Sequence, residues 1–281
     1  MIASIKPVHS LVAAVMAGVG KPDLLVPGAA SPHEYTLRPS DAERLSHAQA
    51  IFWIGPMMES YLERPILALA GNAEVVQLSN APGLRVLAQR KGGAWEINED
   101  APLPPAGEFA KDPHIWLDPV NVRALVALIA SRLASIDADH ATRYTSNAAA
   151  LYRRLDALDQ ELRRKLTPLA DRRFIVFHDA YQYLDRRYGL ADVGSITISP
   201  DQQPGPRRIE EIRRKLRVSG ARCLFVEPDS KPAMVKTVVE GMKIHTGVLD
   251  PEGLKLDPEP ELYFKLMNGI AEALTACLWA P

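Results

Sequence analysis

The chain has little that would direct it to nucleic acid or into a membrane. Its 281 residues carry a formal net charge of −1, so no basic excess favours nucleic acid or an anionic membrane surface as a partner. No apolar run approaches the roughly 20 residues that a membrane-spanning helix needs. The opening MIASIKPV also lacks the basic and long apolar regions of a signal peptide. We therefore expect a globular protein that is either cytosolic or has lost a leader.

Common catalytic motifs are also missing. The sequence has no HExxH of a metalloprotease, no GxSxG nucleophile elbow and no GxxxxGK[ST] phosphate loop. Glu34, beside His33, could act as a general base for a zinc-bound water, but a glutamate in so charged a sequence is more often a surface residue. The missing motifs argue against a hydrolase.

Cysteine is scarce, and Cys223 and Cys277 are the only two. They could be two buried thiols, since a free cysteine behaves as a small hydrophobic residue. They could equally form one disulfide in an oxidising compartment. Their spacing alone does not decide between the two.

The remaining composition is that of an ordinary globular protein, with 47% hydrophobic and 24% charged residues. Short apolar runs alternate with helical patterns in both halves of the chain. Such alternation predicts parallel sheets with helical crossovers. Ser40 is the expected cap of one helix, because Glu43 three residues later completes a capping-box pattern. The expected strands are 2–5, 23–26, 50–54, 74–78, 174–177, 193–198, 223–227 and 246–249, and the second half has helices at 181–188, 209–218, 233–242 and 262–278.

The middle of the chain suggests how the domains are arranged. Residues 80–113 form a long loop that is rich in Pro and Gly and contains no His. Residues 119–166 are almost wholly helical, and the second part, about 28 residues long, has no internal Gly or Pro. We predict an N-terminal α/β lobe (1–136, with the 80–113 loop), a rigid linking backbone helix (137–167) and a C-terminal α/β lobe (168–281).

Four potential metal ligands, His33, His114, His178 and Asp250, each follow an apolar run or lie in a Pro-flanked turn. Three imidazoles and a carboxylate suit tetrahedral Zn²⁺. Ligand groups in parallel α/β lobes collect beyond the carboxyl ends of the strands, so we expect two ligands from each lobe and a metal in the cleft between them. Singly, His114 could cap a turn, His178 could be a hydrogen-bonded core residue, and Asp250 could be a turn residue before Pro251. Their joint placement favours a site.

The stretches around these residues resemble the metal-specific solute-binding proteins of bacterial ABC importers, most closely the ZnuA-type zinc receptors. This resemblance implies two α/β lobes bridged by one long helix, with a metal in the cleft. It also implies that His33, His114 and His178 are the imidazole ligands and that Asp250 matches the aspartate of the C-terminal lobe. The matching stretches, in order along nearly the whole chain, are SIKPVHSLV, PGAASPHEYTLRPSDAERL, WIGPMMESYL, DPHIWLDPVN, FHDAYQYLDRRYGL, ARCLFVEP and GVLDPEG.

The resemblance also implies a metal, a compartment and partners. Manganese receptors have Glu at the position of His178, and the softer imidazole favours zinc. Cys223 and Cys277 match the positions of a family disulfide. The implied protein is a periplasmic monomer that passes Zn²⁺ to the membrane subunit of an ABC permease, without catalysis and without nucleic acid. Pro32 stands where some zinc receptors have Glu, so the fourth ligand would be Asp250 or water.

Three alternatives stay open at this point. A receptor of the same fold could serve manganese or iron, and the His178 ligand type argues against it. A zinc hydrolase using Glu34 would be an enzyme without a recognisable signature. An adhesion or scaffolding protein would hold a structural metal, and reversible metal exchange in the folded protein would separate it from a receptor.

Overall fold

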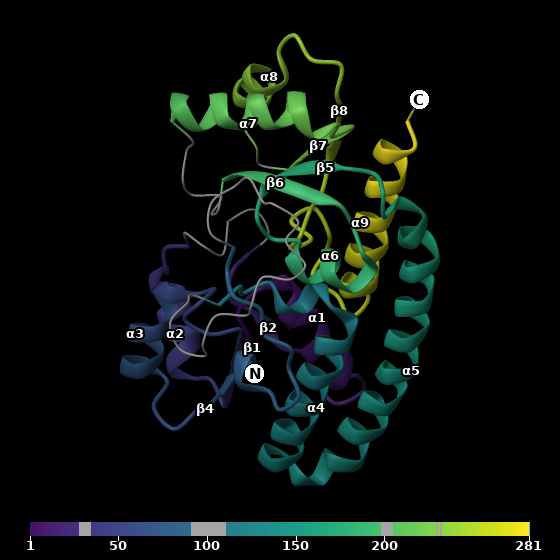
Figure 1. Ribbon diagram of the computed structural model, residues 1–281. Coiled ribbons are helices and arrows are strands. Elements are labelled where there is room, and N and C mark those ends of the chain that lie inside the picture. The colour runs from purple at the N-terminus through teal and green to yellow at the C-terminus, as the bar shows by residue number, and fades with distance from the viewer. Residues whose placement is uncertain (28–34, 91–110, 198–204, 229, 231, 281) are drawn as a thin grey trace. The chain divides into compact units, whose positions relative to one another are not determined.

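The computed structural model describes residues 1–281 except 28–34, 91–110, 198–204, 229, 231 and 281, and it forms two compact units (Figure 1). Each unit contains its own four-stranded parallel sheet. The predicted class, two α/β lobes with a long helix, is confirmed. Unit 1 comprises Met1–Val86, Ile115–Gln160 and Glu252–Leu266, and unit 2 comprises Leu87–His114, Glu161–Pro251 and Met267–Pro281.

The sheet of unit 1 has the order β2-β1-β3-β4. Its strands are short, and helices connect them as the alternation of the sequence predicts. The order reverses direction between β1 and β3, so the carboxyl ends of these two strands mark a switch point of the kind where α/β proteins gather polar groups. The elements are β1 (Ile2–Ala3), α1 (Lys6–Val15), β2 (Asp23–Leu24), α2 (Pro39–Ser46), β3 (Ala50–Trp53), α3 (Ser60–Leu69) and β4 (Glu74–Gln77).

Apolar side chains from α2 and α3 cover one face of this sheet. Leu45 of α2 and Leu62 of α3 are fully buried against Ile51 of β3. Burying a leucine or isoleucine side chain contributes roughly 1.5–3 kcal/mol, so this cluster stabilises the sheet and both helices together. Along α1 every residue from Lys6 to Val15 is buried.

Helix α2 begins differently from the predicted capping box. The residue before its first turn is Arg38, and Pro39 starts the helix, as suits a residue without an N–H. The Asp41 carboxylate accepts the Arg38 backbone N–H at 2.9 Å. Ser40 therefore lies inside the helix, and the prediction that it caps the helix with Glu43 is wrong. Asp41 competes better because its charge also pairs with Arg44 at 2.6 Å.

Two long helices follow the 3₁₀ turn η2 (Ile115–Leu117). They are α4 (Pro119–Ile136) and α5 (Ala141–Leu166), separated by the short η3 (Ala138–His140). The Asp118 side chain caps α4 by accepting the Val120 N–H at 2.9 Å. The long helix predicted for this region is confirmed, and its 26 regular residues belong to α5.

Helix α4 comes closer to a membrane span than the apolar runs of the sequence suggest. Its 18 residues have a mean hydropathy of 1.4 and are apolar enough to cross a bilayer by length and composition alone. One such helix is weak support for a membrane span, because a core helix has the same composition. The side chains of Leu125, Ile129 and Leu133 are fully buried, as in a core helix.

The sheet of unit 2 has the order β6-β5-β7-β8 and reverses direction between β5 and β7. Positions 174, 175 and 176 of β5 lie beside positions 223, 224 and 225 of β7 in parallel register. The elements of this second part of the chain are the 3₁₀ turn η4 (Thr167–Leu169), β5 (Phe174–His178), α6 (Gln182–Tyr188), β6 (Asp192–Thr197), α7 (Pro206–Ser219), β7 (Cys223–Val226), α8 (Pro232–Val239), β8 (His245–Val248) and α9 (Leu262–Leu278). A further 3₁₀ turn, η1 (Leu78–Asn80), follows β4 of the first sheet.

Helices α7 and α8 cover one face of the second sheet (Figure 1). Ile212 and Leu216 of α7 pack in one buried cluster with Ile175 and Leu224 of the sheet. The other face carries Cys223, and its disulfide to Cys277 of α9 joins Cα atoms 6.2 Å apart. The disulfide implied by the resemblance is therefore confirmed.

The division into units is not a simple cut along the sequence. The closing helix α9 contributes Leu262–Leu266 to unit 1 and its remainder to unit 2. Helix α5 is likewise shared, with Gln160 in unit 1 and Glu161 in unit 2. The three consecutive segments predicted from the sequence, 1–136, 137–167 and 168–281, stay a prediction.

Candidate metal centre

His178 is the last residue of β5, at the switch point of the second sheet. The register of β5 and β7 continues for two residues and brings Glu227, just past β7, beside it. His178 Nδ1 lies 3.0 Å from Glu227 Oε1, and both side chains are buried. Because an ionised carboxylate only accepts hydrogen bonds, Nδ1 is the protonated nitrogen and Nε2 carries the lone pair.

His114 has a carboxylate partner of the same kind. Its Nδ1 lies 2.8 Å from Asp112 Oδ1, and its backbone N–H donates to the same oxygen at 3.0 Å. This arrangement again leaves Nε2 as the nitrogen able to bind a metal. A carboxylate on the far nitrogen fixes the tautomer and the ring orientation of a metal-binding histidine.

The structure brings these two histidines together. The ring centroids of His114 and His178 are 4.9 Å apart, with the planes inclined by 70°. Each side chain is only 2% exposed. Two imidazoles with matching carboxylate supports are the ligand type that suits Zn²⁺.

The two imidazoles differ in how readily they take up a proton. Burial, together with the neighbouring His178, holds the pKa of His114 well below its usual range. Burial also acts to lower the pKa of His178, but the charge and hydrogen bond of Glu227, together with the charges of Asp179 and Asp112, outweigh it and raise that pKa. Burial raises the pKa of Asp112 to about 7, against the His114 N–H and the Arg90 charge. His114 thus stays neutral, and His178 is the imidazole that takes up a proton more readily.

A buried ion cluster lies next to this pair. The Arg90 guanidinium donates to Asp179 Oδ1 through Nε at 2.9 Å and through NH2 at 2.5 Å. The same group lies 3.3 Å from Asp185 and 3.5 Å from Asp192. Burial raises the pKa of Asp185 to about 7, and that of Asp192 is also raised, since three carboxylates share one cation. The cluster anchors the segment that precedes His114 on the strand and helix that follow His178.

Only two of the four predicted ligands are seen close together among the residues that the structure describes. His114 and His178 meet, and Asp250 lies two residues beyond the end of β8. His33 is outside the described residues, and so is Glu34, the base of the hydrolase alternative. Within the described part of the chain, no three His, Cys, Asp or Glu side chains are grouped so as to hold a metal. The full ligand set therefore stays a prediction.

The residues that support the imidazoles were not anticipated from the sequence. Asp112 stands two positions before His114, the spacing of a side chain that folds back on its own turn. Glu227 ends the apolar run CLFVE just as His178 ends FIVFH, and two adjacent parallel strands place such end residues side by side. Arg90 carries no comparable signal, because it lies in the Pro- and Gly-rich loop.

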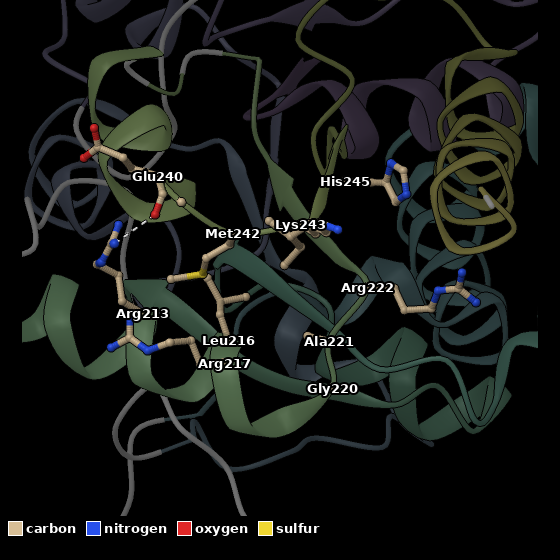
Figure 2. A pocket seen from close by; sticks show the side chains of 12 residues that line it. Arg213, Leu216, Arg217, Gly220, Ala221, Arg222, Glu240, Met242, Lys243 and His245 are labelled. Carbon is tan, nitrogen blue, oxygen red and sulfur yellow. Dashed lines mark hydrogen bonds between the residues drawn. The ribbon is translucent and has the colours of Figure 1, made fainter.

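A separate basic pocket of about 860 Å³ lies at the end of the second sheet opposite to His178, where the strands begin (Figure 2). It is lined by residues that precede β7 and β8, so it opens at the amino ends of the strands. Two of its arginines bond to main-chain carbonyls near helix ends. Arg213 donates to the carbonyls of Val238 at 3.2 Å and Glu240 at 2.9 Å, and Arg222 donates to the carbonyl of Ala280 at 3.1 Å. Cations at helix C-termini are stabilising, so this basic cluster has a structural explanation.

Comparison with known proteins gives consistent matches. Residues 1–277 match the family described as "ZnuA: Zinc-uptake complex component A periplasmic". The chain is 45% identical to the high-affinity zinc uptake system protein ZnuA of Brucella abortus (strain 2308), covering 99% of this chain and 91% of that protein. It is 34% identical to the protein of the same name from Paracoccus denitrificans (strain Pd 1222), covering 100% and 92%.

Solved structures agree with these matches. The crystal structure of a ZnuA deletion mutant with zinc bound is 25% identical, with a TM-score of 0.81, and covers 100% of this chain and 98% of that one.

Proposed function

The chain belongs to the ZnuA family of periplasmic zinc-uptake components, and we propose that it is a zinc receptor that captures Zn²⁺ in the periplasm and delivers it for import. The observation that carries this proposal is the buried pair of His114 and His178, each supported on Nδ1 by a carboxylate. The pair offers two borderline-soft nitrogens, and it lies at a sheet switch point where ligands bind.

Two further donors complete the proposed ligand set. His33 supplies the third imidazole, and Asp250 or a water supplies the fourth position. The support for Asp250 is its place two residues beyond the end of β8, in the same unit as His114 and His178. The support for His33 is its place in the family motif SPHEY.

The receptor works without chemistry beyond binding and release. We propose that it acts as a monomer, without nucleic acid, and passes zinc to the membrane subunit of an ABC permease. The names of the relatives, high-affinity zinc uptake system proteins, support this assignment over a manganese or iron receptor of the same fold. A hydrolase would have to rely on Glu34, for which neither the sequence nor the relatives' names offer support.

Substitution of His178 tests this proposal. His178→Ala should weaken zinc binding by more than the ten- to hundredfold that loss of a supporting residue costs. His178→Glu should lower zinc affinity and narrow the gap to manganese, because it replaces a nitrogen by a harder oxygen donor. Asp250→Ala should cost less than His178→Ala, since water can take its place. Affinities for Zn²⁺ and Mn²⁺ are measured by chelator competition.

The matched control is His245→Ala, which removes an exposed imidazole at the amino end of β8 in the same unit. It should bind zinc as the parent does. Unchanged zinc affinity in both His178 variants would show that His178 is not a ligand. A parent protein that prefers manganese would replace the zinc receptor with the manganese alternative.

A further inference from the structure

We propose that Tyr183 is a positioning residue for zinc binding, whose hydroxyl sets the separation of the His114 and His178 imidazoles. This inference rests on the proposed zinc-receptor function and adds a residue that does not itself touch the metal. It follows from how α6 holds the two ends of the segment that leads to His114.

The Tyr183 hydroxyl bridges both ends of that segment. It accepts the Leu87 backbone N–H at 3.0 Å and donates to the Asp112 carbonyl at 2.9 Å. Leu87 and Asp112 are also bonded to each other, from the Asp112 N–H to the Leu87 carbonyl at 2.9 Å. The side chain of Tyr183 is buried, so water cannot easily replace these bonds.

Asp112 transmits this placement to the metal-binding ring. Its backbone is held by Tyr183, and its Oδ1 accepts both the backbone N–H and the ring Nδ1–H of His114. In the amide orientation that satisfies its neighbours, Gln182 donates to Asp112 Oδ2 and to the Ala88 carbonyl, each at 3.1 Å. Two consecutive residues of α6 therefore fix both the main chain and the carboxylate that orient His114.

The other imidazole belongs to the same strand–helix unit. His178 ends β5, and α6 begins four residues later at Gln182. The position of His178 and the anchor of His114 are thus set by one short stretch of chain, residues 178–183. A metal site loses affinity when its donors are held loosely, so the hydroxyl should matter for binding even though it lies outside the ligand set.

Tyr183→Phe removes the hydroxyl and keeps the buried ring. The matched control is Tyr144→Phe, which removes a hydroxyl bonded to Asp137 at 2.7 Å in unit 1. For the parent and both variants, zinc affinity is measured by chelator competition, apo stability by thermal unfolding, and donor geometry by the visible absorption of bound Co²⁺.

Tyr183→Phe should weaken zinc binding about tenfold and alter the Co²⁺ bands. Tyr144→Phe should lower the melting temperature about as much as Tyr183→Phe does. It should leave the zinc affinity and the Co²⁺ absorption unchanged. A merely structural role for Tyr183 predicts parental affinity in the folded variant, and that result would overturn the proposal. If Tyr183→Phe does not fold, Gln182→Met decides by the same readouts. A parent that binds no zinc would instead refute the proposed function.

Discussion

At the scale of single residues, the carboxylates behind the imidazoles govern how the pair meets a metal. Glu227 is the clearer case, because its charge and hydrogen bond are the largest effects that act against the burial of His178 and raise its pKa. A negative partner on Nδ1 makes Nε2 a better donor but also makes the ring easier to protonate. In the proposed zinc site, zinc capture and sensitivity to acid are therefore linked through the Glu227 side chain.

Glu227→Gln should lower zinc affinity by roughly 10–100-fold, because an amide oxygen can still accept the Nδ1–H but carries no charge. It should also lower the pKa of His178. Protons compete with zinc as the pH falls through that pKa, so the pH at which the zinc affinity begins to fall should be lower in the variant, although its affinity at neutral pH is weaker. Chelator competition from pH 5 to pH 8 measures both effects. Glu240→Gln, at an exposed position in the same unit, is the control, and identical curves for the two variants would contradict the role of Glu227.

Glu59 provides a prediction about stability in unit 1. It is fully buried at the carboxyl edge of the first sheet, where it accepts the Ser4 hydroxyl and the Gly55 N–H. Burial raises its pKa from 4.5 to about 7, against these hydrogen bonds. The folded state then holds a proton that the unfolded state has released. The contribution of Glu59 to the free energy of unfolding should fall by roughly 3 kcal/mol as the pH rises from about 4.5 to about 7.

Urea unfolding across this pH range checks the sign. Glu59→Gln should make the decline shallower by about this amount, since a neutral amide does not titrate, while the buried Asp112 and Asp185 still contribute to it. Glu63→Gln, at an exposed position of α3, should retain it. Identical declines in the parent and in Glu59→Gln would show that Glu59 is already ionised in the folded state.

The two imidazoles could be predicted from the sequence, whereas the residues that support them could not. His114 and His178 stand out because histidines at the ends of apolar runs are uncommon and chemically suited to zinc. Their partners Asp112 and Glu227 look like ordinary acidic residues, since what matters is a register between strands that becomes visible only in the fold. Tyr183 is harder still to find, because its role depends on main-chain groups about seventy and a hundred residues away.

At the scale of elements, the disulfide is the strongest single connection in unit 2. Cys223 begins β7 and Cys277 lies in the last turn of α9, 54 residues later. A cross-link of this span restricts the unfolded chain by about 4 kcal/mol in the chain-entropy model.

The double variant Cys223→Ala/Cys277→Ala should therefore lose about 4 kcal/mol of unfolding free energy. Zinc affinity should change little, because β7 reaches the metal centre through its other end. Denaturant unfolding of the apo-protein measures the loss, and reduction of the parent with a thiol is the matched comparison. Two free thiols in the denatured, unreduced parent would contradict the disulfide itself.

Element boundaries followed the sequence where apolar patterns were strong and departed from it where side chains compete. Strands β5 and β7 and helix α9 lie close to their predicted ranges because buried runs leave few alternatives. The predicted start of α2 was wrong because either of two acidic residues, Glu43 and Asp41, could bond back to the start of a helix. Asp41 has the additional partners Arg44 and Tyr35, which the local pattern cannot reveal.

At the scale of the whole molecule, each unit has its own sheet and its own buried cluster. This separates the protein from small zinc domains that fold only with metal. The parallel sheets and the long helix were predictable from the alternation of patterns. The sharing of α5 and α9 between units was not, because a continuous helix gives no local sign of a boundary.

Zinc should stabilise the protein without being needed for folding. At a thousandfold excess over its dissociation constant it should add about 4 kcal/mol, which raises the melting temperature on the order of 10 °C. Circular dichroism of the metal-free protein and thermal scans with increasing zinc measure this. Magnesium at the same concentration is the control. An apo-protein without helical signal would refute the expectation.

The interleaved units have a consequence for synthesis on the ribosome. Unit 1 is completed by Glu252–Leu266 and unit 2 by Met267–Pro281. A nascent chain that has passed residue 166 has already made every strand of the first sheet and most of its helices, yet it still lacks the segment whose backbone carbonyls receive the buried Lys6 ammonium. The apolar cluster of the first sheet is complete once residue 73 has been made, but Lys6 can donate to these carbonyls, and Cys223 can form its disulfide with Cys277, only when translation is nearly finished.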